Sequence, residues 1–226
     1  MVRPRFSNLP PERQQEILDA AAAEFSTNPY KDASLNRIIE AAGLSKGAMY
    51  YYFDDKEDLY LTVLHQVQDS FMEALGSLGE CHTADEYWKE VEALFIRGGR
   101  MKMERPEMIA IGISFLKAAA AGELSVPPSA FFHGMLGWME DLVKKGQQVR
   151  GVRTDIPSDL LVAMVYGLGE AIDLWAARNV QDMTDIDWKK AIDFYIGMFR
   201  RLLEPGEDEG FFWKIPETTV DDDKED

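Results

Sequence analysis

Hydrophobic residues recur along this chain at the spacing of helix faces. A clear short example is Leu35, Ile38, Ile39 and Ala42, which fall three or four residues apart and so line one side of a helix. Longer patterns of the same kind fill most of the remaining sequence, and no segment shows a strand-like alternation of convincing length. The pattern therefore predicts an all-α fold.

Prolines, glycines and capping residues set the limits of the expected helices. We expect helices at 11–26, 34–42, 45–52 and 59–78, two between 85 and 121, and further helices at 128–142, 157–179 and 188–203. The first of the two helices between 85 and 121 is expected to loosen at Gly98-Gly99, because glycine disfavours helix interiors. Residues 146–157 are expected to form a break.

The short helices at 34–42 and 45–52 are joined by a tight turn. Ser34 and Ser45 suit N-caps, because each hydroxyl can accept a hydrogen bond from a free backbone amide of the first turn. Gly43 stands where a residue with positive φ is needed. The second helix is about 12 Å long, which is enough to present three or four side chains. This arrangement predicts a helix-turn-helix whose second helix enters the major groove of DNA.

The stretch 34–56, SLNRIIEAAGLSKGAMYYYFDDK, resembles the DNA-binding motif of the tetracycline-repressor-like (TetR) family of regulators. The matching features are the amphipathic first helix, the small-residue turn 41–47, the aromatic run 50–53, Lys56, and the acidic-apolar Glu57-Asp58-Leu59. Pro29 departs from the family, which more usually has a glycine before the aromatic residue, and this affects only a loop. The resemblance covers about the first quarter of the chain.

The resemblance implies a cytoplasmic, homodimeric, ligand-responsive transcription factor, most often a repressor. We expect a three-helix head at 1–56 with the helix-turn-helix, and a larger helical body at 57–204 for effector binding and dimerisation. Residues 205–226 are expected to form an acidic tail whose aromatic anchor, Phe211-Phe212-Trp213, docks on the body or on the partner subunit. The long helix after Lys56 would run from the head into the body and act as a lever.

The resemblance also assigns the DNA contacts, residue by residue. These are Ser34, Asn36, Ser45, Lys46, Gly47, Ala48, Tyr50, Tyr51, Tyr52 and Lys56. Lysine can donate to guanine and asparagine can pair with adenine, whereas tyrosine hydroxyls and Lys56 suit phosphate oxygens. Core packing is the alternative for the aromatic run, with Tyr52 or Phe53 facing inward. Arg3 and Arg5 form either a short arm that reaches the DNA backbone or a disordered terminus.

In the body, a set of aromatic and methionine residues falls where the family forms its effector pocket. The set is Phe95, Phe115, Phe131, Met135, Trp138 and Trp175, and His133 could add a polar contact. Such residues predict a large, adaptable apolar cavity, although stripes of this kind also form ordinary core. The last two helices are expected to pair with those of a second subunit. Closing the monomer core is the alternative for them.

Charge changes the picture of the DNA contact. The chain has a net charge of −16, of which residues 1–56 contribute −1 and residues 204–226 contribute −8. Few phosphate contacts per subunit are therefore expected, and DNA binding should need a dimer. The near-neutral head also supports a rival hypothesis: a TetR-like fold that acts through protein contacts without specific DNA binding.

Other functions find little support in the sequence. We expect no cofactor, no metal and no catalysis, because the three histidines are isolated and no phosphate-binding or hydrolase motif occurs. Asp221-Asp222-Asp223 is read as a solvated tail rather than a metal site, and Cys81 beside His82 is a weak candidate for redox sensing. The single cysteine, the lack of a long apolar run and the absence of a signal-peptide pattern favour the reducing cytoplasm and exclude membrane insertion. An enzyme that uses the body's cavity is the remaining rival.

Overall fold

The computed structural model describes residues 4–126, 133–179 and 187–206, and within these residues the protein is all-α. The helices are α1 (Pro4–Ser7), α2 (Pro11–Thr27), α3 (Leu35–Ala41), α4 (Lys46–Tyr52), α5 (Lys56–Leu75), α6 (Ala84–Glu104), α7 (Pro106–Ala120), α9 (His133–Gln148), α10 (Ser158–Asn179) and α11 (Trp188–Leu203). The predicted fold class is confirmed. No helix in the described ranges is long and apolar enough to cross a membrane.

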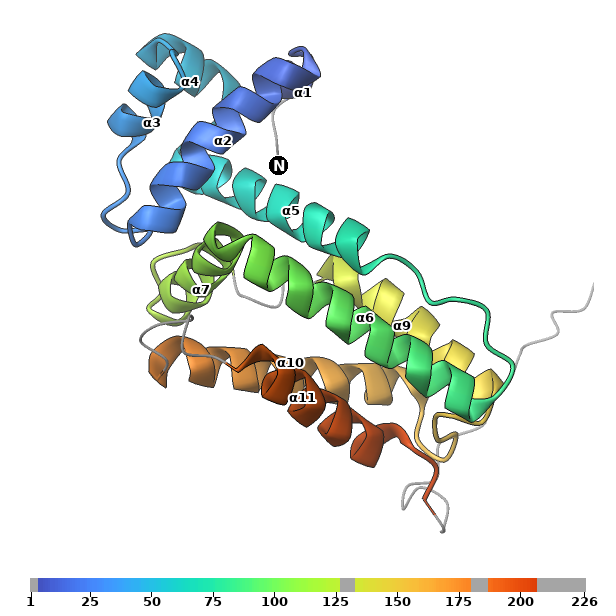
Figure 1. The fold of residues 1–226 in the computed structure, drawn as a ribbon. Coiled ribbons are helices and arrows are strands. Elements are labelled where there is room, and N and C mark those ends of the chain that lie inside the picture. Colours follow the sequence, from blue (N-terminus) through green and yellow to red (C-terminus); the bar gives the residue numbers. More distant parts are fainter. Residues whose placement is uncertain (1–3, 127–132, 180–186, 207–226) are drawn as a thin grey trace, which may run out of the picture.

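Helices α1 to α4 form the head and gather at one end of the molecule (Figure 1). Its core contains Ile17 and Phe25 of α2, Ile38 of α3 and Met49 of α4, all almost fully buried. Short helices such as α3 and α4 gain most of their stability from packing of this kind rather than from intrinsic propensity.

Helix α5 leaves the head and runs along the body (Figure 1). Its Tyr60 is fully buried between Phe25 and Tyr30, with ring centroids 4.6 Å and 4.8 Å away, and its hydroxyl donates to the carbonyl of Ile111 in α7 at 3.3 Å. Burial raises the pKa of Tyr60 to about 12. One core thus joins the head to α5 and α7. The predicted domain boundary between head and body at residue 56 stays a prediction.

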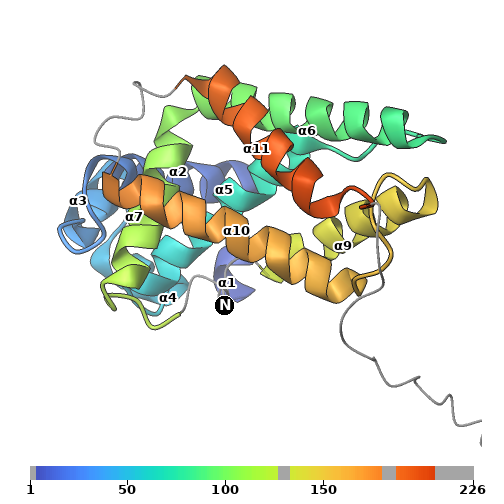
Figure 2. The ribbon, with the colours of Figure 1, turned by 90° about the horizontal axis from the view of Figure 1, so that it is seen from below.

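The remaining helices surround a second core. Helix α6 packs beside α5 and α11, while α10 packs against α7 and α9. Seen from below, α10 and α11 lie on the side of the body away from α5 (Figure 2). The body core is built from Tyr87 and Trp88 of α6 together with Val143, Leu161 and Phe199. These helices enclose the cavity described below.

The expected loosening at Gly98-Gly99 is wrong, because α6 continues through both glycines. A Cβ atom on Gly98 would lie 2.9 Å from a methyl group of Leu75, and one on Gly99 would meet Ile192 of α11. These glycines therefore let α5 and α11 approach α6 closely. The cost of glycine in a helix is offset by packing between helices.

Other limits of the helices also differ from expectation. Helix α1 was not among the predicted helices, and α5 begins at Lys56 and ends before Gly76, whose φ of +68° stops it. Helix α9 covers 133–148, so Gly146 lies inside a helix and packs closely on Tyr87 rather than opening a break. The tail's aromatic anchor lies outside the described residues.

Candidate functional site

The turn between α3 and α4 has the capping geometry that its residue types predict. The Ser34 hydroxyl accepts from the amide of Arg37 at 3.4 Å, and the Ser45 hydroxyl accepts from the amide of Ala48 at 3.1 Å. Gly43 has a φ of +59° between the two helices. Both serine hydroxyls are thus occupied within the protein, and any contact of theirs with DNA would share these bonds.

Helix α4 has one buried and one exposed side. Met49 and the following Phe53 are 1% exposed, whereas the side chains of Tyr50 and Tyr51 are 48% and 50% exposed. Lys46 and Gly47 are exposed at the start of the helix, and Ala48 is half-buried. Phe53 faces inward and Tyr52 is half-buried, so the core-packing alternative holds for this end of the aromatic run. The rest of α4 presents a polar surface.

Gly47 has no packing reason to be a glycine. Its φ is not positive, and a Cβ atom built on it would meet nothing closer than the Ser45 hydroxyl at 3.9 Å. A glycine on an exposed helix costs up to about 1 kcal/mol relative to alanine. Its absence of a side chain is therefore explained better by a partner that approaches the start of α4 closely.

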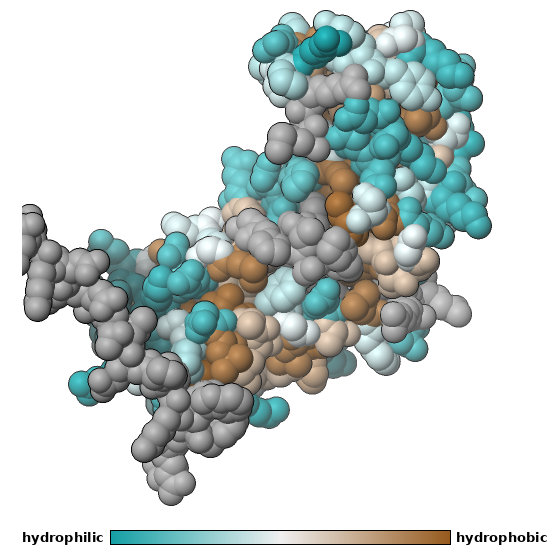
Figure 3. Space-filling view, turned by 180° about the vertical axis from the view of Figure 1, so that it is seen from behind, coloured by the Kyte–Doolittle hydropathy of each residue, from teal (hydrophilic) through white to brown (hydrophobic). Residues whose placement is uncertain are grey.

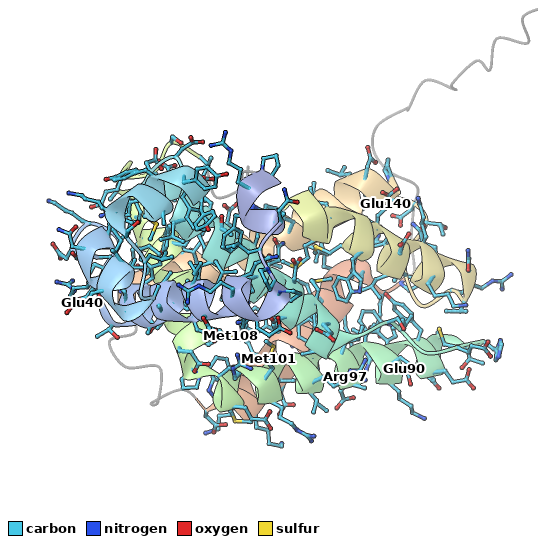
Figure 4. The ribbon with its side chains drawn as sticks, turned by 90° about the horizontal axis from the view of Figure 1, so that it is seen from above. Glu40, Glu90, Arg97, Met101, Met108 and Glu140 are labelled. Carbon is cyan, nitrogen blue, oxygen red and sulfur yellow. The ribbon has the colours of Figure 1, made fainter. Side chains whose placement is uncertain are left out.

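Asn36 lies next to this surface, exposed on the first turn of α3. Glu40, exposed at the end of the same helix, marks the outer edge of the head in Figure 4. The exposed residues that could meet bases therefore come from the starts of both helices. The predicted contacts Asn36, Lys46 and Gly47 are all exposed on the head.

Arg5 joins this surface through α1. Phe6 is 3% exposed and packs on Phe53 at 4.8 Å between ring centroids, which fixes α1 against α4. The Arg5 guanidinium then lies 4.4 Å from the centroid of the Tyr51 ring, a cation–π contact. For Arg5 the described residues favour an ordered position, whereas Arg3 lies outside the described residues. The signal for this ordered position in the sequence was Phe6, an isolated aromatic residue just before Pro10-Pro11.

Lys56 does not have the position that its predicted phosphate contact requires. Its ammonium donates to the carbonyls of Tyr30, Lys31 and Ala33 at 2.7, 3.2 and 3.2 Å, and lies 4.5 Å from the centroid of the Tyr30 ring. All three N–H groups of the ammonium are thus occupied. The predicted role is corrected: Lys56 fastens the loop between α2 and α3 to the start of α5.

Two other head cations are also occupied. Arg37 forms a forked ion pair with Glu24, and this hydrogen-bonded partner lowers the pKa of the Glu24 carboxyl below its usual value. Arg13 donates to the Ala42 carbonyl at 2.8 Å, at the end of α3, and pairs with Glu16. Of the remaining cations of the described head, Lys31 is exposed in the loop before α3, Lys46 lies at the start of α4, and Arg5 lies over Tyr51 of α4.

The body contains a cavity of about 260 Å³. Side chains of α5, α6, α9, α10 and α11 line it, and most are apolar or aromatic. Of the predicted effector contacts, Phe95, Met135 and Trp138 line it. Trp188, which the prediction missed, lines it from the first turn of α11. Glu170 on α10 was also missed, because its spacing marks no motif.

Two predicted effector contacts lie elsewhere. Phe115 is 1% exposed in the core shared by the head and α7, where it packs among apolar residues rather than lining the cavity. Trp175 is 63% exposed on the outer side of α10. Phe131 lies outside the described residues, and the side chain of His133 is also outside the described part. An apolar helix pattern gives the buried side, but it cannot tell a cavity wall from a filled core.

The outer side of α10 is unusually apolar for an exposed helix. Leu160, Met164 and Trp175 are 38%, 37% and 63% exposed, and Phe194 of α11 is 60% exposed. The view from behind shows hydrophobic patches over the body and a mainly hydrophilic head (Figure 3). Contiguous apolar surface of this kind is typical of protein interfaces. Gly167 lies on the same side of α10, and a Cβ atom there would meet nothing within 4 Å.

A capped helix-turn-helix with an exposed second helix, attached to a helical body with a cavity, defines a class of one-component DNA-binding regulators. Residues 17–63 match the model of the family described as bacterial regulatory proteins, tetR family. The head and the start of α5 thus match the DNA-binding part of TetR-family transcriptional regulators. The predicted resemblance is confirmed.

Relatives of known role agree with the family. The fatty acid metabolism regulator protein of Bacillus subtilis (strain 168) is 24% identical over 169 residues, covering 74% of this chain and 85% of that protein. The transcriptional regulator RutR of Escherichia coli (strain K12) is 38% identical over 68 residues, covering 30% of this chain. The chain thus spans only about a third of RutR, 32% of its length, and most of that relative is not matched.

The fold is also shared with solved structures. The regulator FadR from Bacillus subtilis in complex with stearoyl-CoA superposes with a TM-score of 0.64 at 16% identity. The likeness covers 82% of this chain and 96% of that one. At this identity the likeness shows the fold, with its N-terminal helix-turn-helix and helical C-terminal part, and not the ligand.

The corrected role of Lys56 gives a stability prediction. Lys56→Met keeps the apolar stem but leaves three carbonyls without their charged donor, so the free energy of unfolding should fall by about 1–3 kcal/mol. Lys89→Met, which removes an exposed lysine of α6, should change it by less than about 0.5 kcal/mol. Urea denaturation measures both. Equal, small changes for the two variants would show that the Lys56 contacts do not hold the loop.

Proposed function

We propose that the protein is a homodimeric transcriptional repressor that binds a palindromic DNA operator and leaves it when a small apolar or amphipathic molecule fills the body cavity. The observation that carries this proposal is the position of α5. Tyr60, near its start, lies in the core of the head, and Phe71 and Leu75, at its end, line the cavity. One helix therefore contributes both to the core of the head and to the wall of the proposed effector cavity.

In this proposal α4 lies in the major groove. Lys46 donates to guanine O6 or N7, Asn36 of α3 pairs with adenine, and Gly47 and Ala48 allow the backbone to approach the bases. Tyr50, Tyr51 and Tyr52 border the phosphate backbone. Arg5 replaces Lys56 as the cation beside these tyrosines, because its guanidinium is exposed and held over Tyr51. Phosphate contacts of this kind fix the register of the protein on DNA.

Effector binding acts on the distance between the two heads. Helix α5 has 20 residues, so it is about 30 Å long and a small tilt at the cavity moves its head end by several ångströms. Two heads of a bound dimer must sit about 34–36 Å apart, in successive major grooves. An effector that binds more tightly to a tilted α5 therefore shifts the population away from DNA binding.

The chemical nature of the cavity supports an effector that is mainly apolar. The structure of Bacillus subtilis FadR was solved with stearoyl-CoA, and the cavity of this chain is likewise lined by apolar side chains such as Phe71, Leu75 and Phe95. Apolar walls with few polar groups suit hydrophobic ligands better than sugars or nucleotides.

Dimerisation is proposed through the outer sides of α10 and α11. The exposed apolar residues Leu160, Met164, Trp175 and Phe194 would be buried between subunits. Gly167 would let the partner's helix approach α10 closely, since nothing of this chain occupies the space beside it. Gly169, two residues further along α10, lines the cavity instead.

A second candidate function has an observation in its favour. Lys56, Arg37 and Arg13 are occupied within the head, which leaves little charge for nucleic acid. A protein with this fold that acts through protein contacts alone would have such a head. The two candidates differ in whether the head distinguishes one DNA sequence from another.

Removing Lys46 tests base recognition. In an anisotropy titration with DNA from around its own gene, Lys46→Ala should lose about 1–3 kcal/mol of discrimination per half-site, because one base contact disappears. Lys89→Ala, which removes the same charge from α6 of the body, should keep the full discrimination. If the unaltered protein shows no sequence preference at low salt, the protein-contact candidate replaces the repressor.

Removing Arg5 tests the ordered arm. Arg5→Ala should weaken binding to all DNA sequences by a similar factor, because phosphates carry no sequence information. The plot of log affinity against log salt should flatten by about 0.9 for each phosphate contact that is lost, or about 1.8 for a dimer. An unchanged slope would place Arg5 away from the DNA.

A charge on the outer side of α10 tests the dimer interface. Gly167→Glu should convert the dimer to a monomer, because a buried unpaired carboxylate between two apolar helices is strongly unfavourable. Gly137→Glu is the matched control, since Gly137 is exposed on α9 and has equal room for a side chain. Light scattering coupled to size exclusion gives the mass. Dimeric Gly167→Glu protein would contradict the proposed interface.

A further inference from the structure

The charge on the cavity walls is uneven. Among the described residues that line the cavity, Glu170 of α10 is the one with a charged side chain, and nine others are aromatic. Glu170 is half-buried. Within the described part of the chain its carboxylate has no hydrogen bond or ion pair. A carboxylate against an apolar wall is stabilised when an opposite charge joins it, so a cationic group of a ligand would be favoured there.

Two cations of the neighbouring helices already have partners in the chain. Arg97 lies on α6, and its Nε donates to the carbonyl of Leu75 at 2.8 Å. Arg200 of α11 pairs with Glu204 at 2.7 Å, and its guanidinium lies 5.2 Å from the centroid of the Trp88 ring. Neither arginine is among the described residues that line the cavity. The described lining therefore contains no positively charged side chain that could pair with Glu170.

The aromatic walls have the character that a cation needs. The hydroxyl of Tyr87 donates to the carbonyl of Leu142 at 3.2 Å, and the indole nitrogen of Trp88 donates to the carbonyl of Gly151 at 3.0 Å. Their polar atoms are thus occupied, and what they offer the cavity is ring surface, although the Arg200 guanidinium already lies over the Trp88 ring. Trp138 and Trp188 line it as well. Ring faces attract organic cations, most strongly in sites from which water is excluded.

We propose that the effector is an organic cation: an amine or quaternary ammonium group carried on an apolar chain or ring. The apolar part fills the cavity between α5 and α11, and the cationic group meets the Glu170 carboxylate and the neighbouring rings. This inference rests on the proposed role of the cavity as the effector site. It names the ligand class that the charge of this chain's cavity favours over an anionic amphiphile.

Two probes with the same chain and opposite charge test this proposal. Decyltrimethylammonium and decanesulfonate are titrated separately, at micromolar concentrations, into the full-length protein, and binding is followed by tryptophan fluorescence. The cation should bind at least about tenfold more tightly than the sulfonate, a factor that one desolvated cation–π and carboxylate contact can supply. Equal affinities, or tighter binding of the sulfonate, would overturn the proposal.

Two single-residue variants test whether Glu170 causes the preference for the cation. Glu170→Gln should weaken cation binding about tenfold and leave sulfonate binding unchanged or tighter. Glu92→Gln removes an exposed carboxylate from α6, outside the cavity lining, and should change neither affinity. If both variants behave alike, the preference comes from the overall negative charge and not from Glu170, and the proposal is wrong. Unfolding temperatures of the two variants show that each is folded.

A DNA titration separates this inference from the proposed function. If neither probe binds while the protein still recognises DNA from around its own gene, the cation site is wrong and the repressor stands. If the cation binds with the expected preference but no DNA sequence is recognised, the cavity inference stands and the repressor fails. If the protein binds both the cation and DNA in separate titrations, added decyltrimethylammonium should lower its DNA affinity. The Glu170→Gln variant should need about a tenfold higher concentration of the cation for the same loss of affinity.

Discussion

The packing of Tyr60 holds the two halves of this protein together. Its ring lies between Phe25 of α2 and Tyr30 of the following loop, and its hydroxyl reaches the backbone of α7. Lys56, one helical turn earlier, binds three carbonyls of the same loop. These contacts tie the loop between α2 and α3, and with it the head, to α5, and in the proposed mechanism they carry a motion of α5 at the cavity to α4.

Charge is the second constraint on function. An acidic chain with a head close to neutral must bind DNA with few cations, and several of those have structural tasks. In the proposed complex, specific contacts from α4 and the pairing of two heads would have to compensate for the small number of phosphate contacts. The same acidity extends into the body, where Glu170 lines an otherwise apolar cavity. At both the proposed DNA-binding surface and the cavity, partners would be selected by the positions of a few side chains.

Much of the head could be predicted from sequence, because its signals are local. Ser34, Gly43 and Ser45 act through their own backbone, so residue type and spacing suffice. Lys56 could not be placed, because its partners lie about 25 residues away and only tertiary packing brings them near. The predictions for Gly98 and Phe115 were wrong for the same reason. Neighbours on other helices, and not the local sequence, decide whether a glycine breaks a helix or an aromatic residue lines a cavity.

We propose that two identical heads, paired through α10 and α11, bind one DNA site. Hydroxyl-radical footprinting of the full-length protein on DNA from around its own gene tests this directly. We expect two protected patches on one face of the duplex, related by two-fold symmetry, with centres about one helical turn, or a multiple of it, apart. Uniform weak protection without such a pattern, at low salt and saturating protein, would contradict it.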